Sequence, residues 1–202
     1  MSEQGLGRRG FLAGTAAAAA GLVALTAGQS FAPLAPLNAF APRTMGAGPQ
    51  ALPVNRTARQ AQVEAAASDP GWRLEVTGPA GTFALSRAEL AALRQASARL
   101  PIACVEGWST TAEWTGVPLR DLLDAAGIRA GSTVELASLQ RRGPYRVTTM
   151  PAEYARDPLT LVALAVNGHE LDIDHGFPAR VIAPGRPGVL QTKWLHTIRE
   201  AR

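Results

Sequence analysis

The sequence predicts an α+β domain in which short helices interrupt the strands of a mixed sheet. Several short segments alternate apolar and polar residues with the two-residue period that is typical of strands. Two other segments carry helix signals over about two turns each, and they do not alternate regularly with the strands as βαβ units do. The chain has 202 residues, of which 47% are hydrophobic and 18% charged, and this suits one globular domain with a non-globular extension.

The first predicted elements are a hairpin and a helix. Residues 72–78 ("WRLEVTG") alternate apolar and polar side chains and predict a strand, which "GPAG" turns into a second strand over residues 82–86. Ser86 followed by Glu89 forms a capping box, because each side chain can bind a backbone N–H that the first helical turn leaves unpaired. This box predicts a helix that continues to about Arg94.

The middle of the chain predicts a strand, a loop and a helix. Residues 101–105 ("PIACV") read as a short apolar strand that ends at the cysteine, and the small and polar residues 105–114 read as a loop. Pro118 begins a helix with three leucines on one side, and Gly127 ends it. Further strands are predicted at residues 133–139, 145–150, 159–168, 180–184 and 194–199.

The amino terminus resembles a twin-arginine export signal. Arg8 and Arg9 precede an uncharged segment, residues 11–27, that is rich in Ala and Gly. Residues 1–30 are therefore interpreted as a signal that is either removed or kept as a membrane anchor over residues 11–27. The expected location is the periplasm or the outer face of the cytoplasmic membrane, and the export machinery is an expected partner. Because that machinery carries folded proteins, it suits a chain that receives a cofactor before export.

A tether is predicted between this signal and the globular domain. Residues 31–51 are rich in Pro, Ala and Gly and show neither the helical nor the strand period. The globular domain is expected over residues 52–202.

The charge of the chain argues against nucleic acid as a partner. The formal charge is +4 and the isoelectric point is near 10.2, but the 20 basic residues are spread along the chain and aromatic residues make up only 5%. Nucleic-acid binding calls for clustered charge and stacking aromatics, and neither is present in the sequence. Scattered arginines fit a compact anionic cofactor better.

Cys104 is the only cysteine in the chain, which excludes an intramolecular disulfide, CxxC metal sites and CxxCH haem attachment. A single thiol at the end of a strand is either an inert core residue or the reactive group itself.

A second informative stretch spans residues 174–194 and gathers His175, Arg180, Arg186 and Lys193 among glycines and prolines. Cationic donors beside tight turns are typical of phosphate binding, since glycine lets backbone N–H groups approach an anion. Each of these residues taken singly also has a structural interpretation, as a turn or surface residue.

Two stretches resemble a known family. "CVEGWSTTAEWTGVPLRDLLDAAG" and "NGHELDIDHGFPARVIAPGRPGVLQTKWLHTI" look like the two signature regions of the molybdopterin-binding domain of sulfite oxidases and of the catalytic subunit of the bacterial periplasmic methionine sulfoxide reductase. The resemblance runs from about Leu52 to Ile198 and keeps the order and spacing of the motifs. It implies the α+β mixed-sheet fold of the sulfite-oxidase type, with molybdenum-molybdopterin as the cofactor.

The resemblance also implies roles for individual residues. Cys104 is expected to ligate molybdenum as a thiolate, which is a soft ligand suited to a metal already held by sulfur, and to act in catalysis. Tyr145 is expected near the metal as a second catalytic residue, with a core aromatic as the alternative interpretation. The residues expected to contact the cofactor are Asn55, Ser138, His175, Arg180, Gln191, Thr192 and Lys193. Arg141, Arg142 and Arg146 flank Tyr145 and are candidates to bind an anionic substrate, with a solvated loop as the alternative.

The implied activity is oxygen-atom transfer to or from a small sulfur compound, either sulfite oxidation or sulfoxide reduction. Electrons would be exchanged with a separate haem-linked or quinone-linked protein. Two alternatives stay open. One is a cell-envelope hydrolase or transpeptidase that uses Cys104 with His169, His175 or His196 as the base. The other is a non-catalytic module that binds the cofactor.

Overall fold

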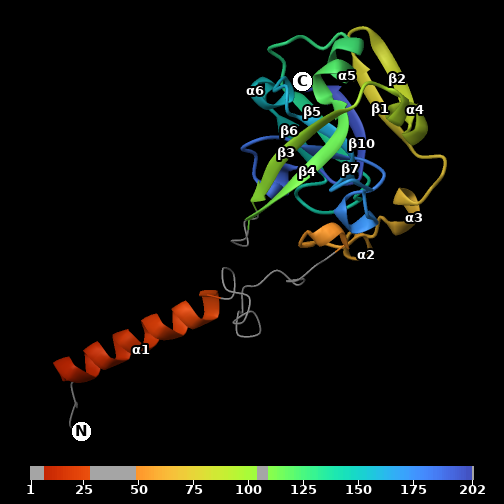
Figure 1. The fold of residues 1–202 in the computed structure, drawn as a ribbon. Helices are drawn as coiled ribbons and strands as arrows, with labels where there is room; N and C mark the ends of the chain where they lie inside the picture. Colours follow the sequence, from red (N-terminus) through yellow and green to blue (C-terminus); the bar gives the residue numbers. More distant parts are fainter. Residues whose placement is uncertain (1–6, 28–48, 104–108, 202) are drawn as a thin grey trace.

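The computed structural model describes residues 7–27, 49–103 and 109–201 (Figure 1). The first helix, α1 (Arg8–Ala27), covers most of the predicted signal. No helix in the described ranges, α1 included, combines the length and apolar character that crossing a membrane requires. Most of the predicted tether lies outside the described residues, and only η2 (Pro49–Ala51) belongs to it.

One sheet of five strands contains the amino-terminal hairpin and the last strand of the chain. Its order is β2-β1-β10-β5-β6, and β1 pairs with β10 in parallel while every other pairing is antiparallel. The predicted mixed sheet is therefore confirmed. The strands are β1 (Arg73–Gly78), β2 (Gly81–Ser86), β5 (Val134–Ser138), β6 (Val147–Met150) and β10 (Leu195–Glu200).

A second sheet is built on the strand that leads to the cysteine. It has the order β3-β4-β7-β8, and β9 also pairs with β7. Its strands are β3 (Ala96–Ala103), β4 (Ser109–Pro118), β7 (Leu161–Val166), β8 (His169–Glu170) and β9 (Arg180–Ile182).

The prediction of a loop over residues 105–114 is wrong for the residues in this range that the structure describes. From Ser109 onward these residues belong to β4, which pairs with β3 from Ser109 to Gly116. Ala112 and Trp114 are buried while their neighbours face outward, and this alternation is the strand period. The many small polar residues mark the outer face of the strand. Cys104 itself lies outside the described residues.

The two predicted helices are present. The capping box of Ser86 and Glu89 is confirmed, and α4 runs over Arg87–Ala92 and thus ends two residues before Arg94. The helix after Pro118 is α5 (Leu119–Ala125), whose three leucines are buried, and Gly127 follows with φ +71°. Three short helices were not predicted: α2 (Ala58–Ala61), α3 (Glu64–Ala67) and α6 (Ala152–Ala155). Of these, α2 begins with a capping box of Thr57 and Gln60, a signal that the sequence analysis missed.

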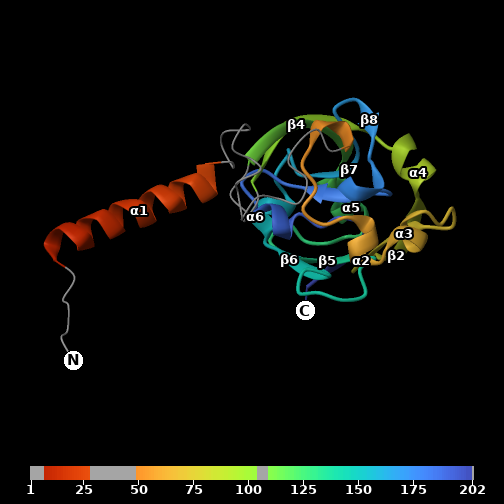
Figure 2. The same cartoon turned by 90° about the horizontal axis from the view of Figure 1, so that it is seen from below.

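The main core lies between the two sheets. Leu74 and Ile198 from the first sheet belong to the same buried cluster as Val117 and Val162 from the second. Figures 1 and 2 show α2 and α3 next to each other, and in Figure 1 they lie at the end of the domain where β3 stops and β4 starts. Leu52, which precedes α2, belongs to a buried cluster with Leu100 and Ile102 of β3, so the start of the globular domain packs on the strand that leads to the cysteine.

Candidate functional site

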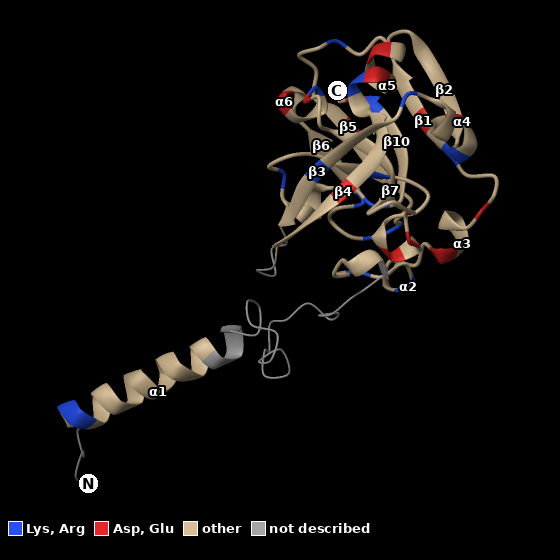
Figure 3. Ribbon diagram, in the orientation of Figure 1, with Lys and Arg blue, Asp and Glu red and all other residues tan. Residues whose placement is uncertain are grey.

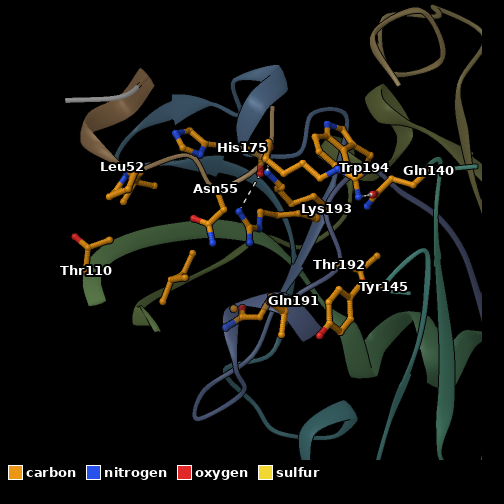
Figure 4. A pocket seen from close by; sticks show the side chains of 16 residues that line it. Leu52, Asn55, Thr110, Gln140, Tyr145, His175, Gln191, Thr192, Lys193 and Trp194 are labelled. Atoms are coloured by element: carbon orange, nitrogen blue, oxygen red, sulfur yellow. Dashed lines mark hydrogen bonds between the residues drawn. The ribbon is translucent and has the colours of Figure 1, made fainter. Parts of the chain in front are cut away.

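A cavity opens at this end of the domain, and Figure 4 shows the side chains that line it. Four parts of the chain contribute to its wall. These are residues 52–56, the facing ends of β3 and β4, the loop between β5 and β6, and residues 175–194. Segments that are far apart in the sequence thus meet around one space, which is the usual form of a binding site.

Most of the residues expected to contact a cofactor line this cavity. Those that do are Asn55, His175, Arg180, Gln191, Thr192 and Lys193. Ser138 is not among the lining residues. Its hydroxyl donates to the carbonyl oxygen of Lys193 at 2.8 Å and accepts from the backbone N–H of Gln140 at 3.2 Å. Ser138 therefore holds two lining residues in place from behind.

The residues on both sides of the undescribed segment that contains Cys104 reach the cavity. Ile102 from β3 and Thr110 from β4 are both lining residues. The end of β3 also lies against Gly188, where a Cβ atom would come within 2.8 Å of the carbonyl oxygen of Ala103. The chain therefore enters and leaves residues 104–108 at the wall of the cavity.

Replacing Gly188 by alanine should push the end of β3 away from this wall. The added Cβ would meet a backbone oxygen, which cannot move without moving the strand, and overpacking of this kind costs about 1–3 kcal/mol. We expect a lower Tm and a lower cofactor content per chain. Gly131→Ala is the matched control, because nothing lies within 4 Å of its Cβ position. Equal Tm and equal cofactor content in the two variants would contradict this packing.

Arg180 is a buried cation inside the cavity. It begins β9 and is only 4% exposed, and its guanidinium lies 4.9 Å from the centre of the Trp114 ring. One of its N–H groups donates to the carbonyl oxygen of His175 at 3.0 Å, whereas its Nε is buried without a partner among the described residues. Burial lowers the pKa of Arg180 to about 10. Trp114 and His175 thus hold the guanidinium in place, and its Nε–H remains available to donate a hydrogen bond to a ligand.

Lys193, the only lysine of the chain, places a second charge in the same cavity. Its Nζ donates to the carbonyl oxygens of Arg56 at 2.6 Å and Asp174 at 2.8 Å. Burial lowers the pKa of Lys193 to about 7, the positive charges of Arg180 and Arg56 act in the same direction, and Asp174 opposes them. Two cations therefore share a space where water compensates them poorly, and an anion would stabilise both.

The turn before these cations depends on a glycine. Gly176 has φ +111° at the end of the short helix η3 (Ile173–His175). A Cβ at this position would meet the Cβ atoms of Arg180 and Lys193 at 3.1 and 3.2 Å. Glycine alone thus satisfies both the backbone conformation and the close packing on the two cationic residues.

The affinity of the cavity for an anion should depend on pH. We expect inorganic sulfate, whose charge is constant between about pH 6 and pH 9, to bind the cofactor-free protein less tightly as the pH rises through 7. The pKa of Lys193 is about 7 without an anion, and a bound anion raises it. Binding of sulfate is therefore coupled to protonation of Lys193. The affinity for sulfate is highest below pH 7 and decreases as the pH rises above 7.

Titration calorimetry in buffers of different ionisation enthalpy measures both the affinity and the proton uptake. Lys193→Met should remove the pH dependence. An affinity for sulfate that is constant over this range in the native protein would contradict the assignment.

Some lining residues had no signal in the sequence. Arg56 and Gln140 are 84 residues apart, yet the guanidinium of Arg56 donates to Oε1 of Gln140 at 2.7 Å and both line the cavity. Tyr145, which the sequence analysis expects near the metal, also lines the cavity. Its side chain is 47% exposed, so the alternative interpretation of Tyr145 as a core aromatic is wrong.

The cationic residues near this stretch do not all belong to the cavity. Arg186 is buried but donates to the carbonyl oxygen of Thr149 at 2.6 Å and lies over the Tyr154 ring, and it is not a lining residue. Arg186 is therefore placed outside the lining of this cavity, although its Nε and Nη1 are buried without a partner among the described residues. Arg141, Arg142 and Arg146 are exposed and also lie outside the lining, as the solvated-loop interpretation has it.

Comparison with known proteins assigns the domain to a described family. The family model of the oxidoreductase molybdopterin-binding domain matches residues 60–201. An NADPH-dependent nitrate reductase from Phytophthora infestans is 40% identical over 98 residues, which are 44% of this chain and 10% of that protein. Sulfite oxidase from Gallus gallus is 36% identical over 157 residues, which are 63% of this chain and 34% of that protein. The chain therefore spans only about a third of the length of the sulfite oxidase and a tenth of that of the nitrate reductase.

A solved structure shares the fold. The sulfane dehydrogenase SoxCD from Paracoccus pantotrophus superposes with a TM-score of 0.58 at 22% identity, over 66% of this chain and 39% of that one. The predicted α+β fold of the sulfite-oxidase type is thereby confirmed. The hydrolase alternative loses its support, because the matched family is one of oxidoreductases. Of its three candidate bases, His175 lines the cavity, whereas His169 and His196 are exposed outside the lining.

Proposed function

This chain belongs to the family of oxidoreductase molybdopterin-binding domains, and from that premise we propose that it transfers an oxygen atom to or from a small sulfur compound, with sulfite as the leading substrate. Its cofactor is molybdenum-molybdopterin. The observation that carries the proposal is the placement of Arg180 and Lys193 in the cavity that Ile102 and Thr110 also line. A cationic recess thus meets both flanks of the segment that contains the only thiol.

The residues present fit this cofactor. Its phosphate matches the charge of Arg180 and Lys193, and the unpartnered Nε of Arg180 is a donor without an acceptor among the described residues. The amide and hydroxyl groups of Asn55, Gln191 and Thr192 supply the neutral hydrogen bonds that a pterin ring requires. Cys104 would supply the protein sulfur. When bound, the molybdenum cofactor supplies two-electron oxygen-atom transfer, and the chain holds and orients it.

Tyr145 is the lining residue that we assign to the substrate. Tyr145 is half exposed at the cavity, and its phenol can donate a hydrogen bond to an anionic oxygen that enters from solvent. Arg56 also lines the cavity and is not assigned to the phosphate, so its positive charge favours an anion such as sulfite over a neutral compound. A small sulfoxide lacks this electrostatic advantage and is the second candidate substrate.

The reaction requires an external electron carrier. Oxidation of sulfite with water yields sulfate, two protons and two electrons, and sulfoxide reduction consumes two protons and two electrons. The single cysteine provides neither an iron–sulfur cluster with four cysteines nor a CxxCH haem in this chain. We therefore assign the electrons to a separate haem-linked or quinone-linked protein.

We further propose that the twin-arginine motif at Arg8 and Arg9 exports the chain, so that it works outside the cytoplasm. The motif and the uncharged stretch after it support this location. Replacing both arginines by lysine should leave the protein in the cytoplasmic fraction. Equal export of the native and the doubly substituted chain would contradict the proposal.

The test of the activity is a substrate screen on purified protein whose molybdenum content is known. We expect about one molybdenum per chain and turnover with sulfite and a one-electron acceptor. Sulfoxides with a reduced donor and nitrate with the same donor are the comparison substrates. Protein that contains molybdenum but turns over nitrate alone would overturn the sulfur substrate. Protein that never contains molybdenum would overturn the proposal as a whole.

A further inference from the structure

The loop between β5 and β6 carries an unusual charge. Residues 139–150 contain three arginines and no carboxylate. All three arginines, Arg141, Arg142 and Arg146, are exposed. We name residues 140–146 the basic loop.

The charges of the basic loop are not neutralised by the residues that the structure describes. Seven ion pairs join arginines to carboxylates in those residues, and none of them includes an arginine of the basic loop. Arg129, by contrast, is exposed and Arg120 is half-buried, and each of them lies within 4 Å of a carboxylate. The positive potential of the basic loop therefore extends into solvent.

The basic loop borders the cavity. Gln140 and Tyr145, which belong to it, are lining residues. Arg56, another lining residue, donates to Gln140 at 2.7 Å, and its Nη1 lies 3.2 Å from the Cβ position of Gly143. The basic loop thus adds its charge next to that of Arg56 at the mouth of the site.

Acidic residues are spread over other elements of the domain. Figure 3 shows them on α3, α5 and α6, which carry Glu64, Asp121, Asp124 and Glu153. An approaching body with a negative surface would therefore be oriented with that surface toward the basic loop.

We propose that the basic loop is the docking surface for an acidic one-electron carrier protein. This inference rests on the proposed function, in which each sulfite releases two electrons. A one-electron carrier accepts them singly, so that two carrier molecules dock in each turnover. Because electron transfer slows steeply with distance, the carrier must dock where the cavity opens, and the basic loop is the charged surface there.

A protein suits this surface better than a small anion does. Single contacts to exposed arginines are worth little, because water and salt screen them. A protein surface with several carboxylates adds many such contacts and is also steered by the potential at longer range.

The test compares two carriers of opposite charge with the full chain loaded with cofactor. Plastocyanin is the acidic probe, cytochrome c is the basic probe, and a small uncharged quinone reports turnover without protein docking. The variant is Arg141→Glu with Arg142→Glu, neither of which lines the cavity. The control is Arg120→Glu with Arg129→Glu, which changes the net charge equally at two arginines elsewhere that do not line the cavity.

We expect the rate constant with plastocyanin at low salt to fall about tenfold in the variant and by less than about twofold in the control. Added salt should remove this difference. Turnover with the quinone should be unchanged in both, and calorimetric titration with oxidised plastocyanin should show weaker binding to the variant alone.

Equal plastocyanin rates and affinities in the native protein and the variant would overturn the docking surface. Faster reaction with cytochrome c than with plastocyanin, insensitive to the variant, would overturn it as well. If the quinone supports no turnover in the native protein, the proposed function fails instead, while the titration still tests the surface.

Discussion

Arg180→Met should abolish cofactor retention while leaving the cofactor-free fold intact. Arg180 is the most deeply buried charge in the cavity, and no other described residue there can replace a guanidinium donor at that position. Loss of a charge-assisted contact to phosphate in a desolvated site costs about 1.5–3 kcal/mol or more, which is at least tenfold in affinity. We therefore expect the molybdenum content per chain to fall at least about tenfold.

The stability of the cofactor-free chain should change little in this variant, because opposing contributions are of similar size. Methionine removes the hydrogen bond to the His175 carbonyl and the contact with the Trp114 ring, which are worth about 1–3 kcal/mol together. It also removes the cost of burying the charge, which the pKa of about 10 puts on the order of 3 kcal/mol. Chemical denaturation of cofactor-free protein measures the difference.

The chain offers a matched control in Arg87→Met. Arg87 likewise lies over an aromatic ring, that of Phe177, and donates to the carbonyl oxygens of Leu164 and Pro178, but it does not line the cavity. This variant should lose some stability and keep its molybdenum. Equal molybdenum loss in both variants would show that the effect of Arg180 is structural.

Cys104→Ser should have the opposite signature, with activity lost and cofactor retained. The contacts that hold the pterin and its phosphate come from residues 55–56 and 175–193, so most of the binding free energy does not involve residue 104. A serine oxygen replaces a soft sulfur ligand poorly. Since loss of even an outer contact to a metal ligand costs 10–100-fold, we expect sulfite turnover to fall about a hundredfold or more.

Parallel measurement of molybdenum, pterin and turnover on the same preparations tests this expectation. A Cys104→Ser protein that lacks pterin would assign the thiol to cofactor binding. A Cys104→Ser protein that keeps full activity would show that the thiol takes no part in the reaction.

Local signals in the sequence were reliable because their partners are near in the chain. The capping box of Ser86 and Glu89 spans three residues, and the helix after Pro118 rests on a fixed backbone angle and an apolar face. Arg180 and Lys193 were also grouped correctly from the sequence, because both lie in the 174–194 stretch and both pack against the turn at Gly176.

Contacts between distant segments could not be predicted in this way. The Arg56–Gln140 pair depends on how the amino-terminal segment crosses the domain, and neither residue type is distinctive in a surface segment. The position of Arg186 outside the cavity lining could not be predicted for a related reason. Its charge and neighbours suggested the cavity, but its side chain packs on Tyr154 and Thr149 instead. Composition identifies which groups are available, whereas the packing of the sheets decides which way each one points.

X-ray absorption at the molybdenum edge tests the central claim most directly, because it counts the sulfur atoms bound to the metal. The native protein should show one more sulfur ligand than Cys104→Ser, with the remaining ligands and the pterin content alike in the two samples. Identical sulfur counts in both, or a native protein that binds no molybdenum, would contradict the assignment of this cavity and its cysteine.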